Sequence, residues 1–217
     1  MVLDDGRELL LSGIEPALPP SAGHLAAQPL AGLATGRMVA FVAAGKDVAP
    51  DRHGRFPVWA WVDGTGQPLQ HDLVAAGAAL ANGLPAGAST PPDCARMLLE
   101  AEKIARQAKM GLWRGGSAIK NAESPGEIVP LVGRFAIVEG RVRSVRAAGA
   151  TLYVNFGRRW IAGFAVPVSR RTMGILEAAG LRPRTWEKRR IRVRGWVELR
   201  GGPRIAVTRP EQVEVLE

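Results

Sequence analysis

Alternating apolar and polar side chains predict short strands in the first half of this 217-residue chain. The strands are expected at residues 8–14, 38–42 and 56–62. In the last of them, Trp59 and Trp61 alternate with small apolar side chains, so we expect both indoles to serve packing. Asp4-Asp5-Gly6 before the first strand and Asp63-Gly64 after the last predict tight turns, because glycine adopts backbone angles that other residues resist.

Helical spacing separates these strands. Helices are predicted at residues 22–35, 69–76 and 91–110. Pro29 is expected to kink or break the first helix, and Gly77 to end the second. The third begins with Pro91-Pro92-Asp93 and is expected to end at Gly111, because proline and an acidic residue suit a first turn and glycine suits the position after a helix.

Residues 114–130 contain many glycine, serine and proline residues and lack apolar periodicity. Such a composition is typical of a connection between domains. We therefore expect a linker at 114–130, between a domain at 1–113 and a domain at 131–217.

The pattern from residue 131 onward predicts five strands and one helix. The strands are expected at residues 135–145, 152–156, 160–166, 191–197 and 205–207, and the helix at 170–179. Ser169 is expected to cap that helix at its start and Gly180 at its end. Three strands, a helix and two strands is the order of an OB-fold, a small barrel that binds oligonucleotides, although an SH3-like barrel or a split sheet shares much of this order.

Charge differs between the two halves. Residues 131–217 carry 18 basic and 7 acidic side chains, a net charge of +11, whereas residues 1–130 have a net charge of −2. A strongly basic domain favours a polyanionic partner, most often nucleic acid, with an anionic membrane surface as the weaker alternative. An arginine-rich composition without any such partner explains the charge equally well.

Several site classes are excluded. The single Cys94 cannot form an intrachain disulfide or a zinc site of several cysteines, and the three histidines lack metal-ligand spacing. No apolar run reaches the roughly 18 residues that a membrane-spanning helix needs, and no signal peptide is visible.

Four motifs in order resemble the thermonuclease (staphylococcal-nuclease-like) family. They are Asp5-Gly6-Arg7 with the strand that follows, the loop Asp51-Arg52-His53-Gly54-Arg55, the turn Asp63-Gly64 with its helix, and Gly111-Leu112-Trp113. The resemblance covers about residues 3–113 and implies a mainly β, α+β protein whose first domain is an OB barrel with helices. It also implies a calcium-dependent phosphodiesterase ancestry.

The residues that the family's chemistry requires are mostly missing. By position in the motifs, Arg55 matches one of two catalytic arginines and Glu15 a calcium-binding aspartate, whereas Leu10 and Leu18 replace the other arginine and the water-positioning glutamate. The family's first calcium-binding aspartate would precede Met1, and Asp4 and Asp5 are poor substitutes because they lie in the hairpin turn. Loss of one transition-state donor typically costs a factor of about 10²–10³ in rate. We therefore expect a pseudoenzyme, without a cofactor unless remaining activity uses Ca²⁺.

The second domain resembles a C-terminal OB-like domain that follows thermonuclease domains in some alphaproteobacterial proteins. The matching stretches lie at 133–145, 153–166 and 191–216, and they imply no established activity. Alternation predicts one basic strand face, which combines arginines with an aromatic side chain as single-strand-binding sheets do. Its members are Arg141, Arg143, Arg190, Arg192, Arg194 and Trp196. A solvated arginine face is the alternative.

Nucleic-acid binding, with single strands favoured, is therefore the predicted function. A weak calcium-dependent endonuclease using Glu15 and Arg55, or a protein–protein interaction module, are the alternatives. The chain begins inside a predicted hairpin, so we expect the family's first strand to lie upstream. Family members are often exported, which leaves the compartment open.

Overall fold

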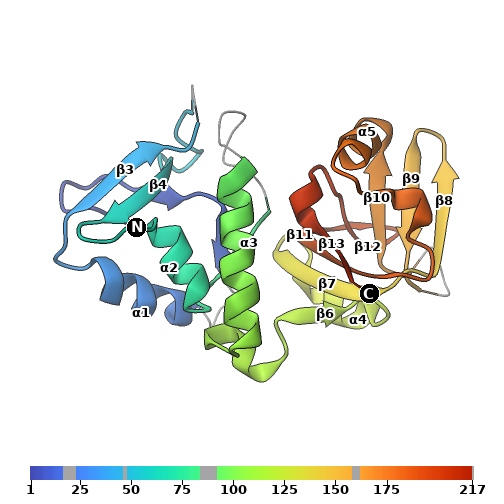
Figure 1. Cartoon of the computed structure of the whole chain (residues 1–217), viewed down its shortest axis with the longest axis horizontal. Coiled ribbons are helices and arrows are strands. Elements are labelled where there is room, and N and C mark those ends of the chain that lie inside the picture. The colour runs from blue at the N-terminus through green and yellow to red at the C-terminus, as the bar shows by residue number, and fades with distance from the viewer. Residues whose placement is uncertain (17–22, 46–47, 84–91, 158–161, 217) are drawn as a thin grey trace. The chain divides into compact units, whose positions relative to one another are not determined.

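The computed structural model describes residues 1–16, 23–45, 48–83, 92–157 and 162–216. The chain divides into two compact units, Met1–Gly116 and Ser117–Glu217. Both units combine helices with a larger number of strands (Figure 1), so the expected α+β class is confirmed.

The described residues of the first unit form five short strands: β1 (Leu9–Leu11), β2 (Ile14–Pro16), β3 (Val39–Ala43), β4 (Phe56–Val62) and β5 (Ala79–Ala81). They form a three-stranded sheet of order β1-β4-β3 and a separate pair, β2 with β5. The expected turn before β1 is present, since the main-chain nitrogen of Leu3 donates to the oxygen of Arg7 at 2.9 Å and Gly6 has a φ of +83°.

The same described ranges contain the helices α1 (Gly23–Ala34), α2 (Leu69–Ala75) and α3 (Pro92–Gln107). A short 3₁₀ helix, Gly111–Gly115, follows α3. Pro29 lies inside α1 without ending it. The core collects Trp59 from β4, Leu69 from α2 and Leu98 from α3, which explains the apolar spacing of all three elements.

Gly77 and Gly111 mark a close approach between the end of α2 and the segment after α3. The main-chain nitrogen of Leu112 donates to the oxygen of Gly77 at 2.9 Å. A Cβ at Gly77 would collide with the main chain of Met110, and one at Gly111 with the main chain of Gly77. Both residues also have positive φ, so glycine is required there for conformation and for space.

Eight strands are present in the part of the second unit that the structure describes. They are β6 (Ile119–Asn121), β7 (Phe135–Arg141), β8 (Ser144–Ala148), β9 (Thr151–Asn155), β10 (Ala165–Ser169), β11 (Arg190–Arg200), β12 (Gly202–Ile205) and β13 (Val213–Leu216). Pairing follows the path β6-β7-β11-β12-β10-β9-β8, and β13 pairs with β11. β10 and β12 run parallel, as do β6 and β7, and the other pairs are antiparallel.

The longest helix of this unit, α5 (Arg170–Ala178), follows β10 directly and lies at one end of the strands (Figure 1). Its expected cap is confirmed, because the Ser169 hydroxyl accepts a hydrogen bond from the main-chain nitrogen of Thr172 at 3.1 Å. The remaining helical turns are α4 (Pro125–Ile128) and the 3₁₀ helices Val129–Leu131, Pro183–Thr185 and Pro210–Gln212.

The expected linker at 114–130 needs a correction. Its residues from 117 onward include β6 and α4, and β6 pairs in parallel with β7. Ala122 and Ile128 are fully buried in the core of the second unit. Ala122 and Ile128 are isolated apolar residues in a segment rich in glycine, serine and proline, so they produced no periodic pattern. Both nevertheless belong to the core.

The expected strand at 135–145 is interrupted between β7 and β8, where the chain changes partners. Val142 exchanges main-chain hydrogen bonds with Lys188 and Arg189, each of 2.8 Å, whereas the nitrogen of Arg143 donates to the oxygen of Asn155 at 2.8 Å. Of the expected strand at 160–166, residues 160 and 161 lie outside the described residues, and β10 begins later, at Ala165. The strand expected at 205–207 instead ends at Ile205, and Val207 makes only an isolated bridge to Val168.

Apolar side chains from every strand after β6 except β8 form the core of the second unit, with Leu176 of α5 and Trp186 also fully or almost fully buried.

Across the described ranges, no helix combines the length and apolar character needed to cross a bilayer.

Candidate nucleic-acid interface

Arg55, which the resemblance places at the position of a catalytic arginine, is bonded within its own loop. Its Nε and Nη2 atoms both donate to Oδ2 of Asp51, at 2.9 and 2.7 Å. The other carboxylate oxygen of Asp51 accepts from the main-chain nitrogens of His53 and Arg55, at 2.8 and 3.0 Å. These hydrogen bonds, those of the Arg55 guanidinium above all, lower the pKa of Asp51 to about 2. The Arg55 guanidinium is therefore engaged within the 51–55 loop.

Glu15, which the resemblance places at the position of a calcium-binding aspartate, lies in β2 opposite Leu80 of β5. Burial raises the pKa of its carboxyl above the ordinary value, and a 3.4 Å hydrogen bond from Nδ2 of Asn82 opposes that rise. In the described part of the chain, no three or more histidine, cysteine, aspartate or glutamate side chains gather into a group that could hold a metal ion.

The other positions carried over from the resemblance contribute no charged group. Leu10 is a half-buried strand residue in β1, and Leu18 lies outside the described residues. Asp5 binds Arg7 in the turn, with 2.7 Å between Oδ2 and Nε, and this bond lowers the pKa of the Asp5 carboxyl. The turn aspartates thus belong to the hairpin, as expected.

Glu102 is a buried carboxylate that the sequence analysis missed. It lies in α3, fully buried, and its Oε2 accepts a hydrogen bond from the main-chain nitrogen of Ala81 at 2.9 Å. Arg106, one turn later, places Nη1 3.6 Å from Oε1. Glu102 falls on the apolar stripe of α3 between Leu98 and Ala105, and that position was the signal available in the sequence. The hydrogen bond that Glu102 accepts from Ala81 links α3 to β5.

The basic face expected on β11 needs a second correction. Arg190, Arg192, Arg194 and Trp196 do alternate with inward apolar residues, but Arg192 is only 8% exposed and Arg194 only 4%. Trp196 is 50% exposed and meets Phe135 edge to face at 6.5 Å between ring centroids. Alternation along a strand predicts a shared face and cannot show whether that face is open.

Glutamates account for the position of Arg192. Its Nε and Nη2 donate to Oε2 of Glu139 at 2.9 and 2.6 Å, and its Nη1 donates to Glu214 at 2.5 Å. Arg190 takes the other oxygen of Glu139 at 2.6 Å. Burial raises the pKa of Glu139, but the hydrogen bonds from Arg192 and Arg190 outweigh it, and the net pKa is lowered. Arg192 thus joins β7, β11 and β13 through its ion pairs.

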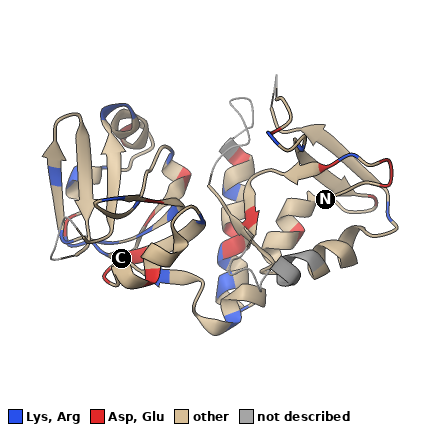
Figure 2. Ribbon diagram, turned by 180° about the vertical axis from the view of Figure 1, so that it is seen from behind, with Lys and Arg blue, Asp and Glu red and all other residues tan. Residues whose placement is uncertain are grey.

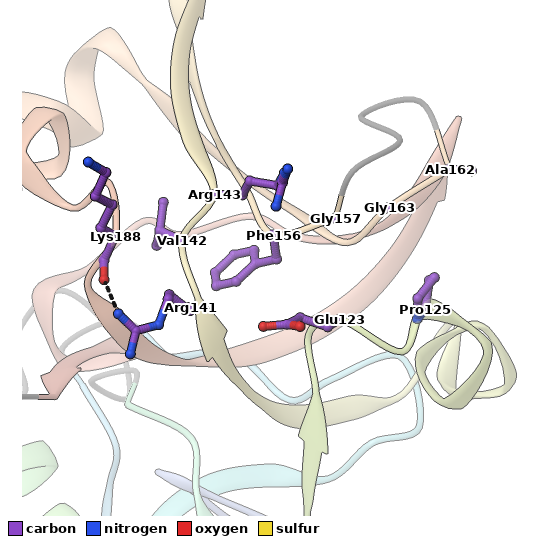
Figure 3. Close-up of a pocket in the computed structure, with 10 residues that line it drawn as sticks. All are labelled: Glu123, Pro125, Arg141, Val142, Arg143, Phe156, Gly157, Ala162, Gly163 and Lys188. Atoms are coloured by element: carbon purple, nitrogen blue, oxygen red, sulfur yellow. Dashed lines mark hydrogen bonds between the residues drawn. The ribbon is translucent and has the colours of Figure 1, made fainter.

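Two adjoining depressions lie on the second unit. The larger, about 840 Å³, is shown in Figure 3. The smaller is about 480 Å³, and both include Glu123 and Arg141 in their walls. We call the two together the basic groove. Its cations are Lys120, Arg141, Arg143, Lys188 and Arg190, and its carboxylates are Glu123 and Glu139.

The junction of β7 and β8 positions the cations of the larger depression. Arg141 donates from Nη1 to the main-chain oxygen of Lys188 at 3.0 Å, a bond drawn in Figure 3. Arg143 follows two residues later, beyond Val142, whose main chain is bonded to Lys188 and Arg189. Three exposed cations are thereby attached to one hydrogen-bonded junction.

The apolar lining of the groove belongs to the core. Phe156 is 3% exposed and packs on Phe164 at 5.4 Å between ring centroids, and Val142 is also buried. A ring so deeply covered cannot offer its face to a base. The described part of the groove therefore offers charge to a ligand and no stacking surface.

Arg141, Arg143 and Arg190 of the predicted site residues meet at this groove, whereas Arg192, Arg194 and Trp196 do not line it. Lys120 and Lys188 were not predicted. Lys188 belongs to the basic run that leads into β11, which was a usable signal, but Lys120 lies inside the segment 114–130 that was expected to be a linker. In Figure 2, lysine and arginine positions, coloured blue on the ribbon, occur on several other elements of this unit as well.

No family model matches this chain, and no curated protein matches it. Solved structures do match, among them one described as OBody AM1L10 bound to hen egg-white lysozyme. That match has 23% sequence identity and a TM-score of 0.31, over 42% of this chain and 89% of the other. A likeness at this level decides neither the fold nor the function.

Proposed function

We propose that this protein binds single-stranded nucleic acid along the basic groove of its second unit, mainly through phosphates. The proposal includes a thermonuclease-like first unit whose catalytic centre is degraded. Among its described residues the groove has five cations and two carboxylates, and Glu139 is already bound by Arg190 and Arg192. This excess of positive charge in a shaped depression is the observation that carries the proposal.

The strand order supports an OB-like barrel as the scaffold. Only Val142 and Arg143 separate β7 from β8, so the pairing path β7-β11-β12-β10-β9-β8 begins and ends on one bent stretch of chain. α5 lies between β10 and β11 in sequence, and β10 and β12 are parallel. When β7 and β8 are counted as one bent strand, the strands on this path number five and α5 follows the third of them. A five-stranded OB barrel has this connectivity, and such barrels bind oligonucleotides.

The contacts that we propose are to the backbone of the nucleic acid. Arg192 and Arg194 are withdrawn from the proposed ligand set because they are buried. Trp196 is six residues from Arg190 along β11, roughly 20 Å at strand spacing, so any stacking on it would be separate from the groove. Contacts to phosphates do not distinguish one base sequence from another, so we expect the protein to bind many sequences with similar affinity.

The first unit supports the degraded-centre part of the proposal. Arg55 is bound to Asp51, and Leu10 has no charge that could bind a phosphate. The pKa of the Glu15 carboxyl is raised, so this group ionises less readily. A phosphodiesterase needs preorganised charge at the developing phosphorane. These residues favour binding over hydrolysis as the function of the molecule.

The test is fluorescence anisotropy of a labelled 20-nucleotide single strand, as DNA and as RNA, titrated with the protein at 50 to 200 mM salt. We expect affinity to fall steeply with salt, by a slope no steeper than about −3.5 for five phosphate contacts at about 0.7 each. Arg143→Glu should weaken binding at 50 mM salt by about tenfold, because one contact is lost and a repulsive charge is added.

Arg171→Glu is the matched control. Arg171 is exposed on α5, does not line the groove, and its substitution changes the net charge equally. Equal weakening by both variants would mean diffuse attraction without a groove. Absence of binding to either strand by folded protein would refute the proposal and leave a protein partner as the better candidate.

A further inference from the structure

Lys188 has an unusual backbone. Its φ is +68°, in the left-handed region that residues with a Cβ seldom occupy. The nitrogen of Arg189 donates to the oxygen of Trp186 at 2.9 Å, so Lys188 is the third residue of a tight turn. At such a position glycine or asparagine is the usual choice, because neither meets the full steric penalty.

The surroundings hold this conformation from both sides. The nitrogen of Lys188 donates to the oxygen of Val142 at 2.8 Å, and its oxygen accepts from Nη1 of Arg141 at 3.0 Å. A glycine could make the same two main-chain bonds without strain. Local folding therefore gives no reason for a lysine here, and strained residues held by their neighbours concentrate at functional sites.

The side chain gives the missing reason. In Figure 3 Arg141 reaches the main-chain oxygen of Lys188, whereas the Lys188 ammonium points away from Arg141. Lys188 is exposed, and no ion pair with a carboxylate is found for it in the described residues. Lys188 is thus one of the residues that line the larger depression, and its main chain is fixed by these two hydrogen bonds.

We propose that Lys188 is a phosphate ligand of the groove and that Arg141 is its positioning residue. The inference rests on the proposed function and adds to it a defined phosphate subsite at the turn after Trp186. Arg141 acts through the main chain of Lys188, by bracing the turn, and the ammonium makes the ionic contact. Lysine, unlike glycine, supplies that contact, which explains why a strained residue is found in the turn.

The test is Lys188→Gly, with Lys188→Arg beside it, in the full chain. Glycine suits the turn but has no charge, so the unfolding temperature should stay within about 3 °C of the parent, since relief of strain offsets the added flexibility of the unfolded chain. Binding of a labelled 20-nucleotide oligothymidine should weaken about tenfold at 50 mM salt, and the salt slope should fall by about 0.7. Lys188→Arg keeps a cation and should bind within about threefold of the parent.

Lys109→Gly is the matched control. Lys109 also has a positive φ, +52°, but it follows α3 in the first unit and does not line the groove. We expect it to leave oligonucleotide binding unchanged. If Lys188→Gly binds with the parent's affinity and slope while the parent shows salt-dependent binding, the subsite is wrong and the proposed function stands. If the parent binds no oligonucleotide, both proposals fail.

Discussion

At the scale of single residues, arginine has two different roles in this protein. Arg55 and Arg192 each donate two hydrogen bonds to one carboxylate oxygen and hold parts of the chain together. Arg143 is exposed in the wall of the groove. The partner decides between the roles, because a guanidinium bound to a buried or loop carboxylate has fewer donors left for a phosphate.

Asp51 provides a pH test of the 51–55 loop. Its pKa of about 2 lies below the ordinary 3.8, so the ionised carboxylate stabilises the loop above about pH 4, and this contribution is lost as pH falls through about 2. A carbon-detected NMR titration should show the Asp51 carboxyl with a midpoint near pH 2, and Arg55→Lys should raise that midpoint. A midpoint near pH 4 in the parent protein would contradict the pairing.

At the scale of elements, β11 is the central strand of the second unit. It pairs with β7, β12 and β13, and the partners of Arg192 lie on two of these, Glu139 on β7 and Glu214 on β13. The charges are opposite one another across the strands, as favourable cross-strand pairs are. At Arg192, in the middle of the expected binding face, the arginine therefore links neighbouring strands and is not open to a ligand.

Arg192→Leu should therefore destabilise the second unit. Glu139 would keep only the bond from exposed Arg190, and a largely buried carboxylate that loses its main partner typically costs about 3 kcal/mol. Urea unfolding followed by far-UV circular dichroism measures this change in the free energy of unfolding. Arg190→Ala is the control, expected to cost less than about 1 kcal/mol because its guanidinium is exposed. Equal costs for the two variants would show that the burial of Arg192 adds no stability.

At the scale of the whole molecule, charge and candidate chemistry belong to different units. Residues 117–217 carry 19 basic and 9 acidic side chains, a net charge of +10, whereas residues 1–116 carry 10 and 11, a net charge of −1. The motifs of the nuclease resemblance lie in the nearly neutral unit. A polyanion would consequently be attracted to the unit that contains no counterpart of those motifs.

We expect the intact protein not to cleave labelled single-stranded DNA in 10 mM calcium beyond an EDTA control. Two positions of the expected catalytic set are apolar, and each missing donor costs about 10²–10³ in rate. Gel electrophoresis of the end-labelled strand measures this directly, with anisotropy on the same sample to show that the protein is active in binding. Cleavage that requires calcium and disappears in Arg55→Ala would overturn the degraded-centre proposal.

The sequence predicted elements where a local rule decides the conformation. Residues 56–62 form β4 as expected from alternation, Ser169 caps α5, and the Asp4-Asp5-Gly6 turn forms. In each case the residues that specify the element lie within a few positions of it. The same holds for the α+β class, which follows from the number and type of such elements.

Only the tertiary structure decided which expected residues are open to a ligand. Arg190, Arg192 and Arg194 are equivalent by alternation, yet Arg192 and Arg194 are buried and Arg190 is exposed. The carboxylates of Glu139 and Glu214 are 53 and 22 residues from Arg192 in sequence, and Lys188 is 47 residues from Arg141. Burial and ion pairing depend on contacts between distant segments, and no local pattern contains that information.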